Sequence, residues 1–218
     1  IHARGKNILK YKGFKELAYL HPNYFTPSKA VLSDYGLSPN SYVFIREVSN
    51  TTLNYSELNE ALLSKICLYL KEMGFDIVLS LENKELRSQF GDYCTILNEP
   101  ISDIHSLLHY AALTIASGDS MSRESCLTGT PAIYTGKRDM AVNRELIKKG
   151  CFFKVDEVSN VMQQVRKIIE NDIKKETGYT IQKAIKNEWD DTTQVIIDVL
   201  LSKLYKDEGL IEKYKMEG

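Results

Sequence analysis

A short polar turn in the middle of the chain has the residue types of an anion-binding site. Ser117, Gly118, Asp119 and Ser120 follow the apolar run 113–116 and precede a segment with helical character. Glycine permits backbone conformations that other residues avoid, and the free amides at a helix amino terminus carry partial positive charge that suits a diphosphate. Ser and Asp are also common N-capping residues. The turn therefore predicts either an anion site or an ordinary helix cap.

Two charged side chains near expected strand ends could complete such a site. Glu124 lies one turn into the expected helix, where a carboxylate would accept hydrogen bonds from a ribose diol or simply complement the helix dipole. Arg46 ends the apolar run 42–45, and its planar guanidinium matches the geometry of a phosphate. Residues 49–51 (Ser-Asn-Thr) would add donors. The alternative is an exposed Arg46–Glu47 pair in a polar loop.

The other chemistry-bearing residues predict no further site. His105 and His109 have the i, i+4 spacing of some metal ligands, but no third ligand is evident, so we expect no metal. The cysteines are widely spaced and form no Cys-x-x-Cys motif, so we expect buried, inert thiols and a reducing, cytoplasmic location. They are Cys67, Cys94, Cys126 and Cys151.

Alternating apolar strands and amphipathic helices must position these residues. Strands are expected over 42–45, 75–81, 94–97, 113–116, 131–134 and 152–155. Helices are expected over 28–36, 57–73, 84–90, 101–112, 121–127, 143–149, 158–169 and 191–204. The strands are continuously apolar, which is typical of a parallel sheet covered on both faces. The pattern predicts an α/β fold with a mainly parallel sheet and helices on both faces.

Length and composition exclude several classes of protein. The chain has 218 residues, 43% of them apolar, and a formal net charge of −1. These values exclude a wholly disordered chain and a strongly basic surface, so we expect no nucleic-acid partner. No apolar run approaches the roughly 18 residues of a membrane helix. The first residue is Ile1 rather than Met, so we expect a piece of a longer protein.

The segment 113–133 (LTIASGDSMSRESCLTGTPAI) resembles the sugar-nucleotide signature of GT-B glycosyltransferases and UDP-N-acetylglucosamine 2-epimerases. Both show a strand, a glycine-containing turn, a Glu on the following helix and a Gly-x-Pro step into the next strand. The chain is most similar to the domain-of-unknown-function family 354 of bacteria and archaea. The segment 12–20 (KGFKELAYL) and the run 44–46 (FIR) extend that similarity.

This resemblance implies a Rossmann-like domain, the carboxyl-terminal half of a GT-B fold, that binds a UDP-sugar. The turn would hold the diphosphate, Glu124 the ribose, and Arg46 would lie near the phosphates. The implied nucleotide-binding residues are Arg46, Ser117, Gly118, Asp119, Ser120, Met121 and Glu124. Asp119 stands where the family has a second glycine. That difference supports the alternative of a degenerate, non-catalytic binding domain.

The resemblance also implies a domain organisation and a reaction. Residues 1–25 would be an interdomain linker, 26–205 the nucleotide-sugar-binding domain and 206–218 a frayed tail. A preceding acceptor domain would be missing from the chain. The whole protein would be a metal-independent glycosyltransferase with a UDP-sugar as substrate and no cofactor, or a UDP-sugar 2-epimerase-like enzyme. Since no general base is evident, we expect the chain alone to be inactive.

Overall fold

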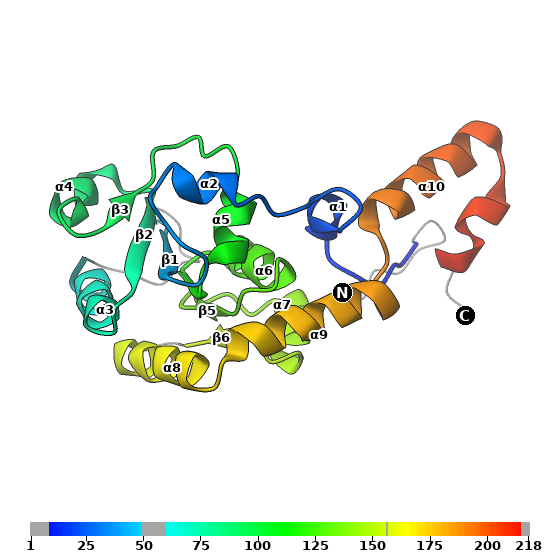
Figure 1. Cartoon of the computed structure of the whole chain (residues 1–218). Helices are drawn as coiled ribbons and strands as arrows, with labels where there is room; N and C mark the ends of the chain where they lie inside the picture. Colours follow the sequence, from blue (N-terminus) through cyan, green and yellow to red (C-terminus); the bar gives the residue numbers. More distant parts are fainter. Residues whose placement is uncertain (1–8, 49–59, 156, 215–218) are drawn as a thin grey trace. The chain divides into compact units, whose positions relative to one another are not determined.

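The computed structural model describes residues 9–48, 60–155 and 157–214 and contains one six-stranded sheet (Figure 1). The strands are β1 (Tyr42–Glu47), β2 (Asp76–Leu81), β3 (Thr95–Ile96), β4 (Leu113–Ala116), β5 (Ala132–Tyr134) and β6 (Phe152–Lys154). Every paired strand is parallel to its neighbour, in the order β3-β2-β1-β4-β5-β6. The predicted parallel α/β fold is confirmed.

The helices follow the strands along the chain, and most have nearly the predicted bounds. The α-helices are α1 (Leu17–Leu20), α2 (Ala30–Ser33), α3 (Glu60–Glu72), α4 (Arg87–Phe90), α5 (Ile104–Tyr110), α6 (Asp119–Leu127), α7 (Ala141–Lys148), α8 (Val158–Glu170), α9 (Ile173–Asn187) and α10 (Thr192–Tyr205). Two 3-10 helices are η1 (Lys84–Leu86) and η2 (Glu208–Tyr214).

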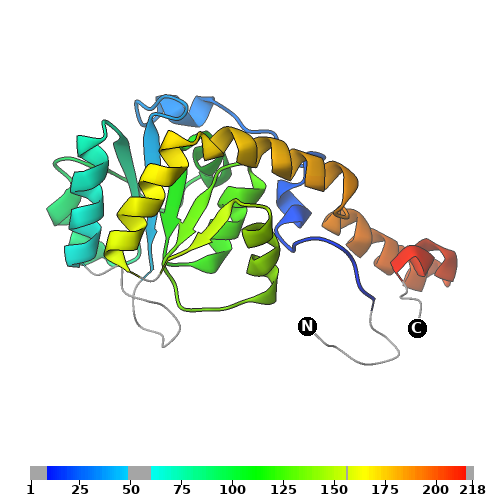
Figure 2. The ribbon, with the colours of Figure 1, turned by 90° about the horizontal axis from the view of Figure 1, so that it is seen from below.

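Each face of the sheet is covered by its own apolar cluster. The first cluster joins side chains of α3 and α8, such as Leu63 and Val165, to β-strand residues such as Ile45 and Ile115. Figure 2 shows α3 and α8 in front of the sheet. The second cluster, on the opposite face, packs Leu107 and other residues of α2 and α5 against the aromatic rings of β1. This two-sided burial explains why the strands are continuously apolar.

The strand order reverses between β1 and β4. The chain moves from β1 outward to β2 and β3, then returns to β4 on the other side of β1 and continues outward to β6. Parallel sheets of this kind bind ligands beyond the carboxyl ends of the strands where the order changes. The ends of β1 and β4 are therefore the place to look for a site.

The chain divides into two compact units, and the sheet lies wholly in one of them. This sheet unit comprises residues 27–181. The terminal unit combines residues 1–26 with residues 182–218. The expected interdomain linker 1–25 thus groups, in the part that is described, with the carboxyl-terminal helix rather than with the sheet.

Within the terminal unit, the amino-terminal segment is joined to the start of α10. The Thr192 hydroxyl donates to the Phe14 carbonyl at 2.8 Å, and Phe14 packs edge-on against Trp189. The Asp191 carboxylate caps α10 by accepting from the Gln194 amide, and it also accepts from the Tyr24 hydroxyl. These contacts order a segment whose sequence alone suggested only a connector.

The end of the chain is also more ordered than predicted. Residues 208–214 form η2 rather than a frayed tail, while residues 215–218 lie outside the described residues. The Tyr214 side chain is buried, and its hydroxyl donates to Asp198 of α10 at 3.0 Å. Lys213 adds an ion pair to the same carboxylate. The Asp198 carboxylate of α10 therefore holds η2 in place through two of its side chains.

Helix α9 was not expected from the sequence. Its residues are mostly polar and include Gly178, which weakens helix propensity. The signal it does contain is a four-residue spacing of Ile173, Thr177, Ile181 and Ile185. That spacing places these four side chains in one narrow stripe along one face of the helix.

No helix among the described residues combines the length and apolar character needed to cross a membrane.

Candidate functional site

The turn between β4 and α6 lies at the carboxyl edge of the sheet, beside the end of β1. Ser117 is fully buried, and its hydroxyl oxygen accepts a hydrogen bond from the Val48 amide at 2.9 Å. The Ser117 amide donates to the Arg46 carbonyl at 3.2 Å. Ser117 therefore joins the two strand ends at the point where the strand order reverses.

Gly118 occupies the N-cap position of α6. A cap without a side chain leaves the first amides of the helix without the usual Ser or Asp acceptor. A Cβ at this position would lie 3.2 Å from the Val48 Cγ2 atom, so glycine also fits a close approach between the two strand ends. Of the two interpretations of the turn, capping by Asp119 or Ser120 is wrong, because α6 begins at Asp119 itself.

The Asp119 carboxylate is buried and is used inside the helix. It accepts a hydrogen bond from the Arg123 guanidinium at 2.8 Å, one turn further along α6. Arg123 is only 3% exposed and also donates to the Asn143 side chain of α7 and to the Ser120 hydroxyl. The more exposed Arg138 lies 3.7 Å from the same carboxylate. The negative charge of Asp119 is thus balanced by Arg123 and Arg138.

On α6, Met121 points to a different side from Ser120 and Glu124. Ser120 is exposed, and Met121 packs against the second cluster. Ser120 and Glu124 are spaced i, i+4 and therefore share one face of the helix. The Glu124 carboxylate is 16% exposed and lies 3.6 Å from the His105 Nε2 atom of α5. A half-buried carboxylate thus stands one turn away from the uncapped helix end.

Arg46 is held on the other side of β1, by acidic residues beyond β2 and β3. Its guanidinium donates to Glu99 at 2.7 Å, to Glu82 at 2.8 Å and to the Ser80 hydroxyl at 2.6 Å. The Arg46 hydrogen bond is the main reason that the pKa of the Glu99 carboxyl lies below its ordinary value. Both terminal nitrogens of Arg46 therefore already have carboxylate partners, and its role near a phosphate stays a prediction.

Glu47 supports the fold at the same edge. The residue is 5% exposed, and its carboxylate accepts hydrogen bonds from the Glu82 and Asn83 amides, both at 3.0 Å. The exposed Arg46–Glu47 pair expected as an alternative is therefore wrong, because the two side chains alternate to opposite faces of β1. Residues 49–51, considered as further donors, lie outside the described residues.

Several residues of this edge were missed by sequence reasoning. Arg123, Asn143 and Glu99 lie in different elements, and only the i, i+4 spacing of Asp119 and Arg123 was readable from the sequence. His105 was considered only as a metal ligand. Within the described ranges, no group of three or more metal-ligating side chains comes together.

Comparison with known proteins identifies the family. Residues 1–205 match the family described as a protein of unknown function, DUF354. The chain belongs to the DUF354 family. Uncharacterized protein MJ0665 of Methanocaldococcus jannaschii is 22% identical to this DUF354 chain over 167 residues, which are 74% of this chain and 48% of the relative.

The solved structures with the same fold include a UDP complex, a putative UDP-N-acetylglucosamine 2-epimerase and a glycosyltransferase. S. aureus MnaA in complex with UDP superimposes with a TM-score of 0.62 at 13% identity, covering 86% of the DUF354 chain and 53% of MnaA. A putative UDP-N-acetylglucosamine 2-epimerase from Listeria monocytogenes gives 0.58 at 17% identity, covering 86% and 50%. The glycosyltransferase SnogD from Streptomyces nogalater gives 0.55 at 16% identity, covering 86% and 54%.

These similarities show the fold, which is the Rossmann-like half found in GT-B glycosyltransferases and UDP-N-acetylglucosamine 2-epimerases. The DUF354 chain spans about half the length of the proteins it matches.

Proposed function

We propose that this chain is the donor half of a GT-B-like, metal-independent glycosyltransferase and binds a UDP-sugar. The observation that carries the proposal is the glycine-capped amino terminus of α6 at the reversal of strand order. The diphosphate would accept hydrogen bonds from the first amides of α6, where the helix dipole favours negative charge. Ser120 is exposed beside these amides and would add a hydroxyl donor.

The buried side chain of Arg123 supports diphosphate binding despite the presence of Asp119. An unpaired carboxylate at this position would repel a diphosphate, but Asp119 is ion-paired with Arg123 and lies close to Arg138. The local charge is therefore balanced before a ligand arrives. This arrangement weakens the case for a degenerate turn, which rested on Asp119 alone.

Glu124 is the proposed ribose ligand. Its carboxylate is partly exposed on the same face of α6 as Ser120, about one turn from the helix end. A carboxylate accepts hydrogen bonds from two adjacent hydroxyl groups, which is the pattern that a ribose diol offers. The proposal therefore assigns the diphosphate and the ribose to one face of a single helix.

In the proposed reaction, the sugar passes to an acceptor by displacement at its anomeric carbon. The amides of α6 would stabilise the negative charge that develops on the departing UDP, so neither a metal nor a cofactor is invoked. The acceptor and the general base would come from an amino-terminal domain of the same protein. For that reason we propose that the chain alone has no transferase activity, to be tested against the longest natural form of the protein.

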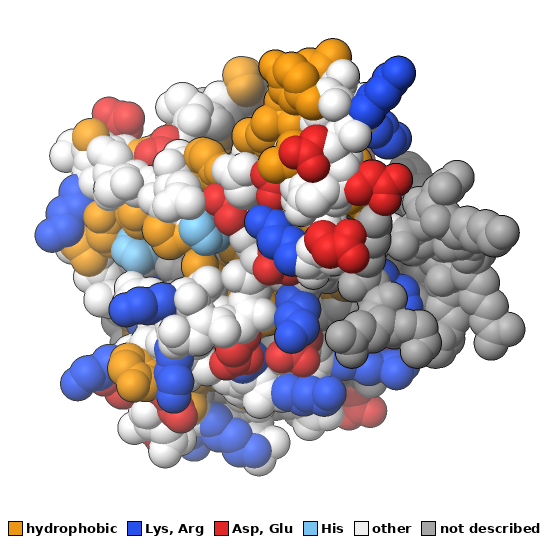
Figure 3. Space-filling model, turned by 90° about the vertical axis from the view of Figure 1, so that its right-hand side faces the viewer, with side chains coloured by type: hydrophobic (Ala, Val, Ile, Leu, Met, Phe, Trp, Pro, Cys, Tyr) orange, Lys and Arg blue, Asp and Glu red, His pale blue; other side chains and the backbone are white. Residues whose placement is uncertain are grey.

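An exposed apolar surface on α10 supports the proposal that another domain, such as this amino-terminal domain, contacts the chain. Hydrophobic side chains gather at the top of the face shown in Figure 3. The exposed apolar residues of α10 are Ile196, Ile197, Leu200, Leu201, Leu204 and Tyr205. A patch of this composition is typical of a protein contact.

A UDP-sugar 2-epimerase-like activity is the second candidate. The sequence of residues 45–50 and the hydrogen bonds of Arg46 and Glu47 count against it. The epimerases carry a His-Arg-Arg-Glu-Asn segment, of which residues 45–50 of this chain keep only a part. The retained Arg46 and Glu47 are both engaged by residues of the β2 and β3 ends. Release of free UDP and an epimerised sugar by the longest natural form, without an acceptor, would select this alternative.

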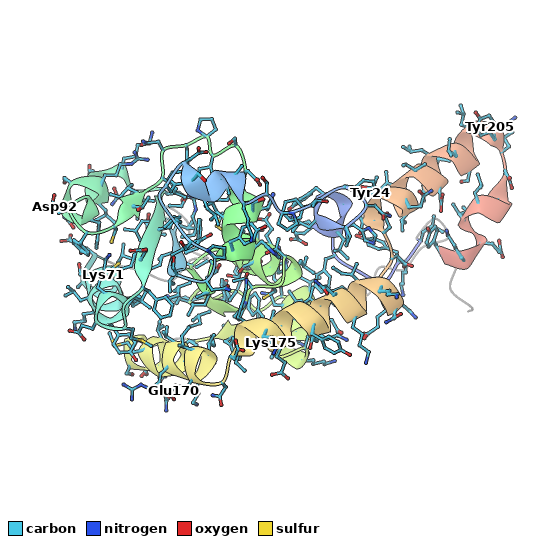
Figure 4. The ribbon with its side chains drawn as sticks, viewed as in Figure 1. Tyr24, Lys71, Asp92, Glu170, Lys175 and Tyr205 are labelled. Carbon is cyan, nitrogen blue, oxygen red and sulfur yellow. The ribbon has the colours of Figure 1, made fainter. Side chains whose placement is uncertain are left out.

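Thermal melts with nucleotides test the binding proposal. We expect UDP and UDP-sugars to raise the Tm, and GDP, CDP and NAD to raise it less. At a hundred times its dissociation constant, a bound ligand adds about 2.7 kcal/mol to the free energy of unfolding. In Glu124→Ala the UDP shift should shrink. The matched control is Glu170→Ala at the exposed end of α8, labelled in Figure 4, which should keep the full shift.

Three results would count against the proposal. A larger shift with GDP, CDP or NAD would reject UDP as the nucleotide. An undiminished UDP shift in Glu124→Ala would move the ribose site elsewhere. No shift with any nucleotide, in this chain and in the longest natural form, would favour a degenerate binding domain.

A further inference from the structure

We propose that Arg138 is the side-chain ligand of the diphosphate at the β4–α6 turn and contacts the phosphate that is further from the ribose. The inference rests on the proposed function and deepens it, because it names a residue that would distinguish a nucleoside diphosphate from a monophosphate. Arg138 lies on the loop 135–140, between the end of β5 and the start of α7, and its side chain is 41% exposed.

The backbone holds this loop against the β4–α6 turn. The paired strands β4 and β5 end side by side, at Ala116 and Tyr134. A Cβ on Gly136 would lie 2.5 Å from the Ser117 carbonyl oxygen, so a larger residue would force the loop away from the turn. The Arg138 amide donates to the hydroxyl oxygen of buried Tyr134 at 3.2 Å. Arg138 therefore starts from a defined position next to the turn.

The Asp119 carboxylate directs the Arg138 side chain toward the first residues of α6. Its Oδ2 atom accepts a hydrogen bond from buried Arg123 at 2.8 Å, and its Oδ1 atom lies 3.7 Å from the Arg138 Nη1 atom. The second distance is too long for a direct hydrogen bond, although the opposite charges still attract. The Arg138 donors can therefore turn to an anion while Asp119 keeps its hydrogen bond with Arg123.

A second acidic residue on the same loop is paired with a different arginine. The Asp139 carboxylate accepts a hydrogen bond from Arg144 of α7 at 2.7 Å. The planar guanidinium of Arg138, partly exposed beside Asp119, can offer two parallel donors to a phosphate. The loop thus brings a suitable cation to the turn without neutralising it through its own neighbour in sequence.

The place of Arg138 along α6 indicates which phosphate it would contact. Asp119 is the first residue of α6, and the proposed ribose ligand Glu124 lies five residues later, about 7.5 Å along the helix axis. A nucleotide with its ribose at Glu124 and its phosphates over the first amides would have its last phosphate nearest to Arg138. The added cation should therefore favour UDP over UMP.

Titration calorimetry of the full chain with UDP and with UMP tests the inference. We expect Arg138→Gln to raise the Kd for UDP roughly tenfold, because a charge-assisted contact is lost, and to raise the Kd for UMP less than about twofold. Arg138→Lys keeps the charge but not the planar fork, so its Kd for UDP should lie between those of the wild type and Arg138→Gln. The matched control is Arg166→Gln near the end of α8. Arg166 is an exposed arginine 4.0 Å from the Glu170 carboxylate, and its replacement should leave both Kd values unchanged.

The outcomes separate this inference from the proposed function. If the wild type binds UDP and Arg138→Gln binds it equally well, the inference is overturned and the proposed function stands. An equal loss for UDP and UMP would overturn the assignment to the second phosphate. If the wild type does not bind UDP, in this chain and in the longest natural form, both are overturned. Since the Arg138 side chain is partly exposed, its replacement should leave the fold intact, which circular dichroism checks.

Discussion

Arg123 is the residue on which the charge balance of the β4–α6 turn depends. It is nearly inaccessible to solvent and connects Asp119, Ser120 and Asn143 in two helices. A buried ion pair contributes little when compared with apolar residues of the same shape, yet breaking it leaves one charge buried without its partner. Replacing Arg123 alone should therefore lower the stability of the fold much more than replacing both members of the ion pair with apolar residues.

We expect Arg123→Met to lower the free energy of unfolding by about 3 kcal/mol, because the buried Asp119 carboxylate loses its 2.8 Å ion pair and keeps the more distant Arg138 at 3.7 Å. The double variant Arg123→Met, Asp119→Leu should recover most of this loss. Urea unfolding monitored by circular dichroism gives both values. Equal losses in the single and the double variant would show that the ion pair is not what Arg123 contributes.

At the scale of elements, α9 depends on a close contact with the loop between α6 and β5. A Cβ on Gly129 would lie 3.3 Å from the Gly178 Cα atom, and Gly129 has a φ of +95°, so glycine is required on the loop side. Lys174 of α9 enters the same contact and donates hydrogen bonds to the His109 carbonyl and the Thr130 hydroxyl. Burial lowers the pKa of Lys174 from 10.5 to about 7.

This lowered pKa makes stability depend on pH. The unfolded chain keeps the Lys174 proton up to about pH 10.5, whereas the folded chain releases it near pH 7. Between these values the unfolded state binds more protons, so stability rises with pH, and the burial cost is complete below pH 7. His109, whose pKa is lowered mainly by burial, titrates below this window.

We expect Lys174→Met to raise the free energy of unfolding by about 1–3 kcal/mol at pH 7, and by much less at pH 10, because the neutral side chain has no charge to desolvate. The expected gain is moderate, since two hydrogen bonds are lost with the amine. Lys175→Met, an exposed neighbour labelled in Figure 4, should show no such pH dependence. Denaturant unfolding at the two pH values measures the effect, and a gain for Lys174→Met that is the same at both would contradict it.

At the scale of the whole molecule, both apolar clusters belong to the sheet unit. The residues of the first cluster lie between positions 43 and 173, and those of the second between 31 and 121. The terminal unit has its own contacts, among them the Thr192–Phe14 and Tyr214–Asp198 hydrogen bonds. Neither cluster needs a residue of the terminal unit, so the sheet unit has the core of an independent domain.

A chain of residues 27–187, which ends at the last residue of α9, should therefore fold on its own. We expect one cooperative thermal transition, and dispersed methyl signals in its NMR spectrum, because both clusters are retained. If UDP binds as proposed, this shorter chain should bind it too. A non-cooperative melt would show that the terminal unit contributes to the stability of the sheet unit.

The sequence by itself determined the parallel α/β fold and the position of the β4–α6 turn. Continuous apolar strands, the amphipathic period of α3 and α8, and the glycine before α6 are local signals, and local signals can be read along the chain. The sequence left open whether the turn is an anion site or an ordinary helix cap, because the capping residue depends on where the helix starts.

Only the tertiary structure decided which distant residues meet. Strand order brings β1 beside both β2 and β4, and this places Arg46 against Glu82 and Glu99 rather than over the turn. Partners of this kind are fixed by register and packing between elements, and a pattern along one segment contains neither.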